Sequence, residues 1–409
     1  MNKIERLLQT LAPKGVGFRK LGEVINILKG KQLNKELLLD YGKYPVMNGG
    51  IYASGYWNEY NTDYPKIIIS QGGASAGYVN YMTSKFWAGA HCYTIELNSE
   101  KLNYKFLYYF LKNSQTILMK SQFGAGIPAL NKADIENLTI PIPPLEIQQE
   151  IVKILDAFTE LNTELNTELN ARKKQYEYYQ NMLLDFNDIN QNHKDAKERL
   201  AQKTYPKRLK TLLQTLAPKG VGFRKLGEVL EYDQPNQYCV TSKEFDKSYP
   251  TPVLTAGKTF ILGYTNEKDN IYQANKNAPV IIFDDFTTAT QWVDFPFKVK
   301  SSAMKILFSK NPTINIRFIF FYMQTIPYNI GGEHARHWIS RYSQLEVPIP
   351  PLEIQQEIVK ILDQFSILTT DLLAGIPAEI KARKKQYEYY REKLLTFKPL
   401  TPNKEVKKC

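Results

Sequence analysis

The sequence predicts an α+β protein with two similar globular domains, each followed by a long α-helix. Three strings of residues occur twice in the 409 residues, and the stretches between them differ. The repeated strings are LLQTLAPKGVGFRKLGEV at 7–24 and 212–229, PIPPLEIQQEIVKILD at 141–156 and 348–363, and ARKKQYEYY at 171–179 and 382–390. The chain therefore runs twice through one order of elements, in which identical segments frame two unlike domains.

Each copy of PIPPLEIQQEIVKILD begins a helix, because its prolines suit an extended lead-in and a first helical turn. From Ile147 onward, apolar residues alternate at spacings of four and three, which is a heptad seam. Helices of about forty residues usually need a partner helix, and the other copy is the expected one. The alternative is that each helix packs only on its own domain. We expect a kink in the second copy at Gly375-Ile376-Pro377.

Each domain has short strands, turns and one apolar helix. The expected strands are 51–57, 66–70 and 278–286, with a Gly-rich turn at 72–79 and helices at 104–112 and 315–326. These features divide the chain into a first domain with its N-terminal helix (1–144), a first long helix (145–186), a polar linker (187–211), a second domain (212–351), a second long helix (352–397) and a tail (398–409).

Composition narrows the class of protein. A chain of 409 residues is too long for one core, and a formal charge of +12 points toward a polyanion. The chain has no run of eighteen apolar residues that would span a membrane. Its first residues lack the apolar core of a signal peptide, and its three cysteines form no disulfide framework. We therefore expect a cytoplasmic protein.

Candidate chemical motifs are weak. The AGKT string at 256–259 is no phosphate-binding loop, because Pro252 stands where the rule needs glycine. Asp284 and Asp285 could hold a metal, but an acidic pair at a strand end is usually a cap. His334 and His337 lack a third metal ligand, and beside Arg336 they suit a basic loop facing DNA. No nucleophile–base pair or pair of catalytic carboxylates stands out, so we expect neither catalytic residues nor a metal site.

Residues that could read DNA are Lys and Arg, which suit phosphate or guanine, and Gln and Asn, which suit adenine. We expect DNA contacts from loops of both domains. The candidates are Lys29, Lys31, Gln32, Asn48, Gln71 and Ser75 in the first domain, and Lys243, Lys258, Thr259, Gln291, His334, Arg336 and Arg341 in the second.

The whole pattern resembles a type I restriction–modification specificity (S) subunit. PIPPLEIQQEIV at the end of each domain, followed by a long helix, is its most specific part, and the segments FGAGIPALNKADIENLTIPIPPL and HARHWISRYSQLEVPIPPL look like the family's domain-closing segments. The resemblance implies two target-recognition domains, each reading one half of a bipartite site in double-stranded DNA. It also implies an antiparallel coiled coil of the two helices as a spacer between the domains.

The same resemblance implies the partners. Two methyltransferase subunits would bring S-adenosylmethionine, and restriction subunits would bring ATP and Mg, so this chain would need no cofactor. The expected partner-binding residues are Leu145, Ile147, Ile151, Leu352, Ile354 and Ile358. The competing classes are a stand-alone DNA-binding regulator, which would more often carry a helix-turn-helix or zinc module, and a coiled-coil scaffold that binds no DNA.

Overall fold

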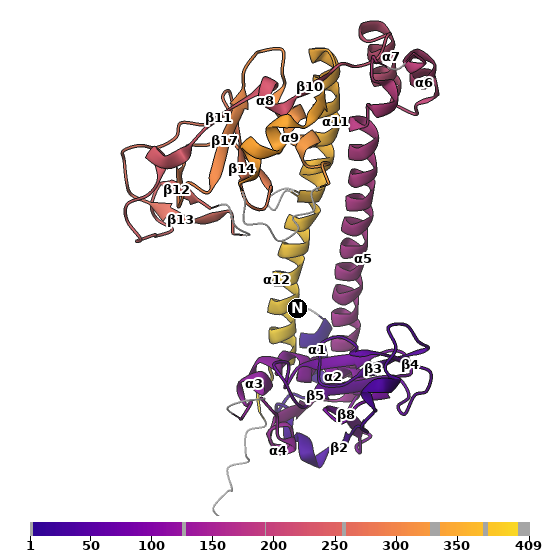
Figure 1. Ribbon diagram of the computed structural model, residues 1–409. Helices are drawn as coiled ribbons and strands as arrows, with labels where there is room; N and C mark the ends of the chain where they lie inside the picture. Colours follow the sequence, from indigo (N-terminus) through magenta and orange to yellow (C-terminus); the bar gives the residue numbers. More distant parts are fainter. Residues whose placement is uncertain are drawn as a thin grey trace, which may run out of the picture. The chain divides into compact units, whose positions relative to one another are not determined.

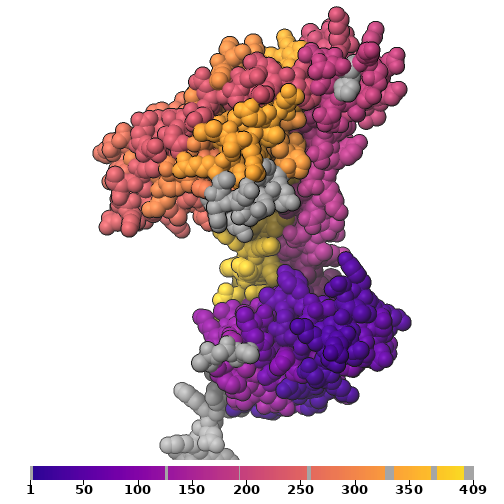
Figure 2. Space-filling model, in the orientation of Figure 1, coloured from indigo at the N-terminus to yellow at the C-terminus, as the bar shows by residue number. Residues whose placement is uncertain are grey.

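The computed structural model describes residues 3–124, 128–192, 194–255, 259–327, 336–370 and 375–399. The chain forms two compact units: Met1–Asn166 together with Glu379–Cys409, and Thr167–Ala378. Each unit combines one globular domain with parts of both long helices (Figure 1). In the space-filling view, the indigo and purple residues of the first domain are gathered in one body on the visible face (Figure 2), as expected for a domain with its own hydrophobic core.

The first unit contains short strands and helices that follow the N-terminal helix. The helices are α1 (Lys3–Leu11), α2 (Tyr104–Asn113), α3 (Gln115–Lys120) and α4 (Lys132–Glu136), and the strands are β1 (Gly17–Lys20), β2 (Ile25–Lys29), β3 (Tyr44–Met47), β4 (Gly55–Trp57), β5 (Lys66–Ser70), β6 (Val79–Met82), β7 (Trp87–Ala88), β8 (Cys92–Leu97) and β9 (Thr139–Ile142). Among the described residues, the sheet orders are β1–β9, β2–β8–β5–β6 and β4–β3–β7. All pairs are antiparallel except β3 with β7.

The second unit has the same topology built from different residues. Its helices are α6 (Ala196–Gln202), α7 (Lys207–Leu216), α8 (Leu226–Val229), α9 (Ile316–Met323) and α10 (His337–Ser340), and its strands are β10 (Phe223–Lys225), β11 (Leu230–Asp233), β12 (Thr251–Leu254), β13 (Ile261–Thr265), β14 (Val280–Asp284), β15 (Thr290–Val293), β16 (Lys298–Val299), β17 (Met304–Ser309) and β18 (Glu346–Pro348). The sheet orders in its described part are β10–β18, β11–β17–β14–β15 and β13–β12–β16, strand for strand those of the first unit.

The central strand of each four-stranded sheet divides its side chains between two cores. In β5, Ile67 and Ile69 pack in the main core with α2, whereas Ile68 packs with residues of β3 and β7. In β14, Ile281 and Phe283 face the main core in the same way. This alternation is the two-residue period of a strand covered on both faces. It explains why KIIIS and PVIIF read as continuous apolar runs.

A buried glutamine in the repeated string anchors each long helix to its domain. In the first unit, Gln148 is fully buried, and its Oε1 accepts a hydrogen bond of 2.7 Å from the backbone N–H of Asn103, the N-cap of α2. Its Nε2 donates to the carbonyls of Lys101 (2.9 Å) and Pro143 (2.6 Å). Gln355 makes the corresponding three bonds in the second unit. Both side chains are thus fully used inside the fold.

Ion pairs at matching positions support this anchor. Asp156 accepts from Lys105 of α2 at 2.8 Å, and Asp363 pairs with Arg317 of α9 at the same distance. Glu150 and Glu357 bind the N-terminal helices of the two units through Lys3 (2.6 Å) and Arg208 (3.1 Å), respectively. The repeated string therefore makes the same set of contacts in both units. Its acidic residues are identical in the two copies, whereas the partner is a lysine in the first unit and an arginine in the second.

The two copies of the long helix pair antiparallel. In the first unit, Phe158 of α5 (Leu145–Leu184) stacks on Tyr390 of α12 (Ile376–Leu395), with ring centroids 5.6 Å apart. In the second unit, Tyr179 of α5 stacks on Phe365 of α11 (Leu352–Thr370) at 5.0 Å. Later residues of the first helix thus meet earlier residues of the second copy. The predicted pairing of the helices is confirmed.

The second copy is described as two helices, and residues 371–374 between them lie outside the described residues. The segment that we expected to be kinked, Gly375-Ile376-Pro377, stands where α12 begins. Proline is tolerated there because the first turn needs no backbone donor.

Most expected elements of the domains are present, with α2 and α9 confirming the two apolar helices. The strand expected over 51–57 is shorter than predicted, since only Gly55–Trp57 is extended and paired. The physical reason is that the carbonyl of Ile51 accepts from the side chain of Asn80 at 3.0 Å instead of from a neighbouring strand.

Candidate nucleic-acid interface

Loops that leave β2, β3 and β5 meet the loop that enters β8 at one end of the first domain. We call Gly30–Gln32, Asn48–Gly50, Gln71–Ser75, Gly89–His91 and Pro128–Leu130 the loop cluster. Backbone bonds join its members to one another and to β7: Gln71 N–H donates to His91 O (2.9 Å), Leu130 N–H to Gln71 O (2.8 Å) and Lys31 N–H to Ala88 O of β7 (2.8 Å). Loops carried by strand ends are a common place for recognition residues, because the sheet fixes their positions.

Glycine is required where these loops approach one another. A Cβ on Gly89 would lie 2.5 Å from Oδ1 of Asn48, and one on Gly49 would lie 3.0 Å from the carbonyl of Gly72 with φ already at +84°. Side chains at these positions would push the loops apart. The glycines thus allow polar side chains from separate loops to gather on one small surface.

The six residues that we expected to contact DNA in the first domain lie in the loop cluster or beside it. Lys31 and Gln32 are exposed within it, and Lys29 is exposed at the end of β2. Asn48, Gln71 and Ser75 are half-buried. The sequence therefore selected residues that the fold brings together, but their contact with DNA stays a prediction.

Sequence reasoning missed His91, which is exposed at the centre of this cluster. Its backbone N–H donates to Oδ1 of Asn48 (3.0 Å), and its ring Nδ1 lies 3.3 Å from Oε1 of Gln71. Asn48 and Gln71, two of the residues expected to contact DNA, therefore use their side-chain oxygens to hold His91. The signal in the sequence was slight: a single histidine shortly after Gly89, outside every strand and helix that we expected.

The second domain carries loops at the same places with other side chains. Asp285 N–H donates to Ala303 O (3.3 Å) and His337 N–H donates to Asp285 O (2.9 Å), as Gln71 and Leu130 do in the first unit. Thr259 and Arg336 are exposed in these loops. Lys243 and Arg341 are exposed in neighbouring loops, Gln291 is exposed on the edge strand β15, and the candidates Lys258 and His334 lie outside the described residues.

His337 and the acidic pair do not form a surface site. His337 is 1% exposed and Asp285 fully buried, so neither faces DNA through its side chain. Asp285 Oδ2 lies 3.5 Å from Nζ of the buried Lys305, while Asp284 caps the next turn by accepting from Phe286 N–H at 2.9 Å. The expectation that both histidines of HARH lie in a loop facing DNA is wrong for the side chain of His337, because its backbone is hydrogen-bonded to the residue after β14 and its ring is buried.

The loop that bears Lys243 is fixed by a carboxylate. Glu267 accepts from the backbone N–H groups of Thr241 (2.9 Å) and Ser242 (2.8 Å) and pairs with the buried Lys298 at 2.8 Å. Burial opposes ionisation of this carboxyl, but the hydrogen bonds from Lys298 and from the loop prevail and lower its pKa to about 2. The charged form of Glu267 therefore holds the loop in place at neutral pH.

The apolar residues expected to dock methyltransferase subunits need a correction. Ile147, Ile151, Ile354 and Ile358 are fully buried in the cores of their own units. Their side chains hold the helices on their domains and cannot offer a surface to a second protein. Leu145 is 39% exposed and Leu352 is half-buried, so these two stay candidates.

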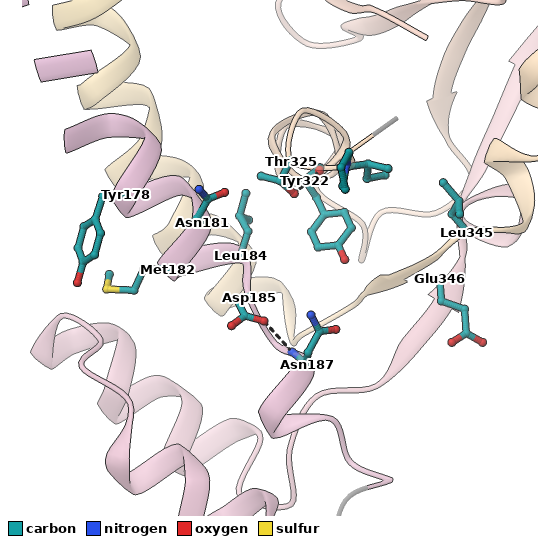
Figure 3. Close-up of a pocket in the computed structure, with 12 residues that line it drawn as sticks. Tyr178, Asn181, Met182, Leu184, Asp185, Asn187, Tyr322, Thr325, Leu345 and Glu346 are labelled. Carbon is teal, nitrogen blue, oxygen red and sulfur yellow. Dashed lines mark hydrogen bonds between the residues drawn. The ribbon is translucent and has the colours of Figure 1, made fainter. Parts of the chain in front are cut away.

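The second unit also has an open groove of about 620 Å³ between the end of α5 and the end of α9 (Figure 3). Tyr178, Met182 and Tyr322 line it together with two carboxylates, Asp185 and Glu346. Such a lining suits no phosphate, because like charges repel. The groove is therefore not part of the candidate nucleic-acid interface.

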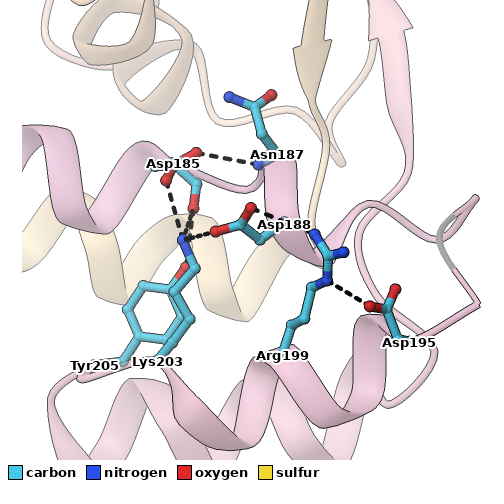
Figure 4. Close-up of polar contacts among 7 residues, drawn as sticks. All are labelled: Asp185, Asn187, Asp188, Asp195, Arg199, Lys203 and Tyr205. Atoms are coloured by element: carbon cyan, nitrogen blue, oxygen red, sulfur yellow. Dashed lines mark hydrogen bonds and ion pairs between the residues drawn. The ribbon is translucent and has the colours of Figure 1, made fainter.

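The expected polar linker after α5 is folded rather than extended. Nζ of Lys203 lies between Asp185 (3.0 Å) and Asp188 (3.1 Å), and Arg199 binds Asp195 at 2.7 Å (Figure 4). Burial disfavours the charge on Lys203, but the two aspartates prevail and raise its pKa. Helix α6 and Tyr205 also pack on the main core of the second unit, which a count of charged residues could not show.

No group of three or more His, Cys, Asp or Glu residues suited to a metal ion occurs in the part of the chain that the structure describes. None of the described helices has the length and apolar character needed to cross a bilayer.

Comparisons with known proteins agree with this architecture. The family model for the type I restriction modification DNA specificity domain matches twice, at residues 13–174 and 218–382. The chain is 54% identical over 183 residues to the type I restriction enzyme EcoR124I/EcoR124II specificity subunit of Escherichia coli, a match that spans 42% of this chain and 44% of that protein. It is 30% identical to a putative type I restriction enzyme specificity subunit of Haemophilus influenzae, over 96% of this chain and 98% of that one.

Solved structures show the same fold. The S subunit of a type I restriction–modification system from M. genitalium superposes with a TM-score of 0.62 at 21% identity, over 95% of this chain and 97% of that one. The two matched domains together cover most of the sequence, and each contains one of the two sets of strands that share one topology. The chain therefore belongs to the type I restriction–modification DNA specificity subunits, which are the non-catalytic members of their complexes.

Proposed function

We propose that each domain of this chain reads one half of a bipartite site in double-stranded DNA. The observation that carries the proposal is that two units of one topology present different side chains at the same loop positions. Asn48 and His91 in the first unit correspond to Thr255 and Ala303 in the second. The half-buried Gln71 corresponds to Asp285, whose side chain is buried and does not reach the surface. Different donors and acceptors on one scaffold suit two different half-sites.

Charge supports contact with DNA. The chain carries 53 Lys and Arg residues against 41 Asp and Glu residues, and the exposed Lys29 and Lys31 border the loop cluster. Cations around a polar surface suit phosphates on either side of the bases being read, and they bring DNA and protein together.

The helices would dock two methyltransferase subunits. The exposed residues of the repeated string are the same in both copies, with Glu146, Gln149 and Lys153 matched by Glu353, Gln356 and Lys360. Two identical surfaces suit two copies of one partner. S-adenosylmethionine would be bound by those partners, and ATP and Mg by restriction subunits. This chain would position the partners, and its antiparallel helices would set the distance between the half-sites.

Methylome sequencing of cells with and without the gene tests the proposal. Because the methyltransferase would depend on this chain to find its site, we expect a bipartite methylated motif that disappears when the chain is absent. It should return when the chain and its methyltransferase are supplied together, and not with either protein alone. Methylation that persists without the chain would refute the proposal. DNA binding by the chain with no methylation in any combination would instead favour a stand-alone regulator.

A further inference from the structure

His91 has the geometry of a pre-oriented reader in the loop cluster. Hydrogen bonds at both its backbone N–H, to Asn48, and its backbone carbonyl, from Gln71, fix its main chain. A Cβ on Gly72 would lie 3.4 Å from Nδ1 of the imidazole, so the ring rests close to the backbone of the neighbouring loop. The side chain is exposed despite these attachments. An exposed polar group with so little freedom loses little entropy when it binds a ligand.

The contact with Gln71 determines which ring nitrogen carries the proton. The side-chain oxygen Oε1 of Gln71 lies 3.3 Å from Nδ1 of His91. An amide oxygen accepts but cannot donate, so only a protonated Nδ1 can make this hydrogen bond. In the neutral ring, Nε2 is therefore left as an acceptor.

Nε2 of His91 is available for a ligand. The hydrogen bonds of His91 to described residues involve its backbone and Nδ1, and none involves Nε2. Nε2 is also not one of the buried polar atoms that lack a partner in the described part of the chain. In the major groove, the groups that donate a hydrogen bond to such an acceptor are the exocyclic amino groups: N6 of adenine and N4 of cytosine. Phosphates and guanine O6 and N7 offer acceptors and would leave Nε2 without a donor.

We infer that His91 is a specificity-determining residue of the first domain and accepts a hydrogen bond from the amino group of an adenine or cytosine. Gln71 is a positioning residue, since it acts through the ring of His91. This inference rests on the proposed function, because it assumes that the loop cluster faces the bases.

Alanine at this position is compatible with the fold. Ala303 occupies the corresponding place in the second unit, where its carbonyl accepts from Asp285 N–H as that of His91 accepts from Gln71 N–H. The variant His91→Ala should therefore fold and assemble normally. His91→Gln places an amide oxygen near the position of Nε2 and is the conservative variant.

The test uses the complex of the chain with its methyltransferase subunits. Its dissociation constant is measured for the cognate duplex and for duplexes with one base pair exchanged at a time, at several salt concentrations. We expect the wild type to prefer an amino-bearing base by about tenfold at one position of the first half-site. His91→Ala should reduce that preference to about twofold at this position alone. His91→Gln should retain part of it.

The second half-site in the same duplex is the internal control, and its preferences should be unchanged in every variant. A loss of affinity in His91→Ala that is equal for all sequences, with a shallower salt dependence, would show a phosphate contact and overturn the inference. Unchanged preferences would also overturn it. If the wild-type complex showed no sequence preference at all, the proposed function itself would fail, which distinguishes the two outcomes.

Discussion

Insertion of a fourth TELN tetrad into the first long helix should lengthen the distance between the half-sites. The three existing tetrads occupy residues 159–170 inside α5. Their polar side chains bond to backbone carbonyls one turn earlier, as in Thr163 to Thr159 (2.9 Å) and Asn166 to Asn162 (2.6 Å). A further tetrad would repeat these hydrogen bonds and would add one more leucine like the half-buried leucine of each existing tetrad. The helix should therefore remain intact.

The magnitude follows from helix geometry. Four residues add about 6 Å and about 40° beyond a full turn. Base pairs rise about 3.4 Å each and turn about 35° each, so the added length corresponds to one or two base pairs and the added rotation to about one. In the heptad seam, an insertion of four residues is a stutter, which a coiled coil accommodates by local unwinding. The two half-site sequences should stay the same, because the domains are untouched.

The assay is methylome sequencing of cells that carry the insertion variant and its methyltransferase. The expected motif keeps both half-sites and gains one or two unspecified base pairs between them. Glu164→Gln is a length-neutral control in the same tract, at an exposed position, and should leave the motif unchanged. An insertion variant with an unchanged distance between the half-sites, or with an altered half-site, would show that the helix does not set the spacing.

Three further predictions follow from the described contacts. Gln148→Leu removes three buried hydrogen bonds and should lower the free energy of unfolding by ~3 kcal/mol, measured by urea unfolding, whereas Gln149→Leu at the exposed neighbouring position should change it little. Glu267→Gln should destabilise the chain at pH 7. Because the carboxyl has a pKa of about 2 in the folded state against an ordinary 4.5, the difference from wild type should shrink as the pH falls from 4.5 toward 2 in thermal unfolding at stepwise lower pH. Arg336→Ala should weaken binding at one half-site by ~1–3 kcal/mol if the guanidinium reads a base; equal affinity and an equal salt dependence in a DNA titration would remove Arg336 from the interface.

The repeated segments made the frame predictable from the sequence. Identical strings predicted two domains and two paired helices, and the heptad seam predicted which face of each helix is apolar. The period alone could not say what covers that face. Ile147 and Ile151 pack on their own domain, whereas Phe158, in the same seam, packs on the other helix. The same heptad seam thus packs on a globular domain in its first part and on the other helix further along.

The loop cluster was only partly predictable. We predicted Asn48 and Gln71 as DNA contacts because they are amide side chains in glycine-rich loops. The fold does bring them together, since both contact His91. Their contact with His91 depends on three strand ends that are distant in sequence, so no local pattern shows it. Likewise His337 resembled a surface residue in a basic string, but a backbone bond to Asp285 places it inside the domain.

The central claim is that two interchangeable domains on identical supports each read one half-site. A chain in which residues 226–347 are replaced by residues 21–140 tests it most directly, since the segments that flank both stretches are the same. With its methyltransferase, this chain should methylate a symmetric motif: the first half-site followed by its inverted copy. Assembly of the complex is checked by gel filtration. Methylation of the original asymmetric motif by the assembled complex, or of a motif unrelated to the first half-site, would contradict the account.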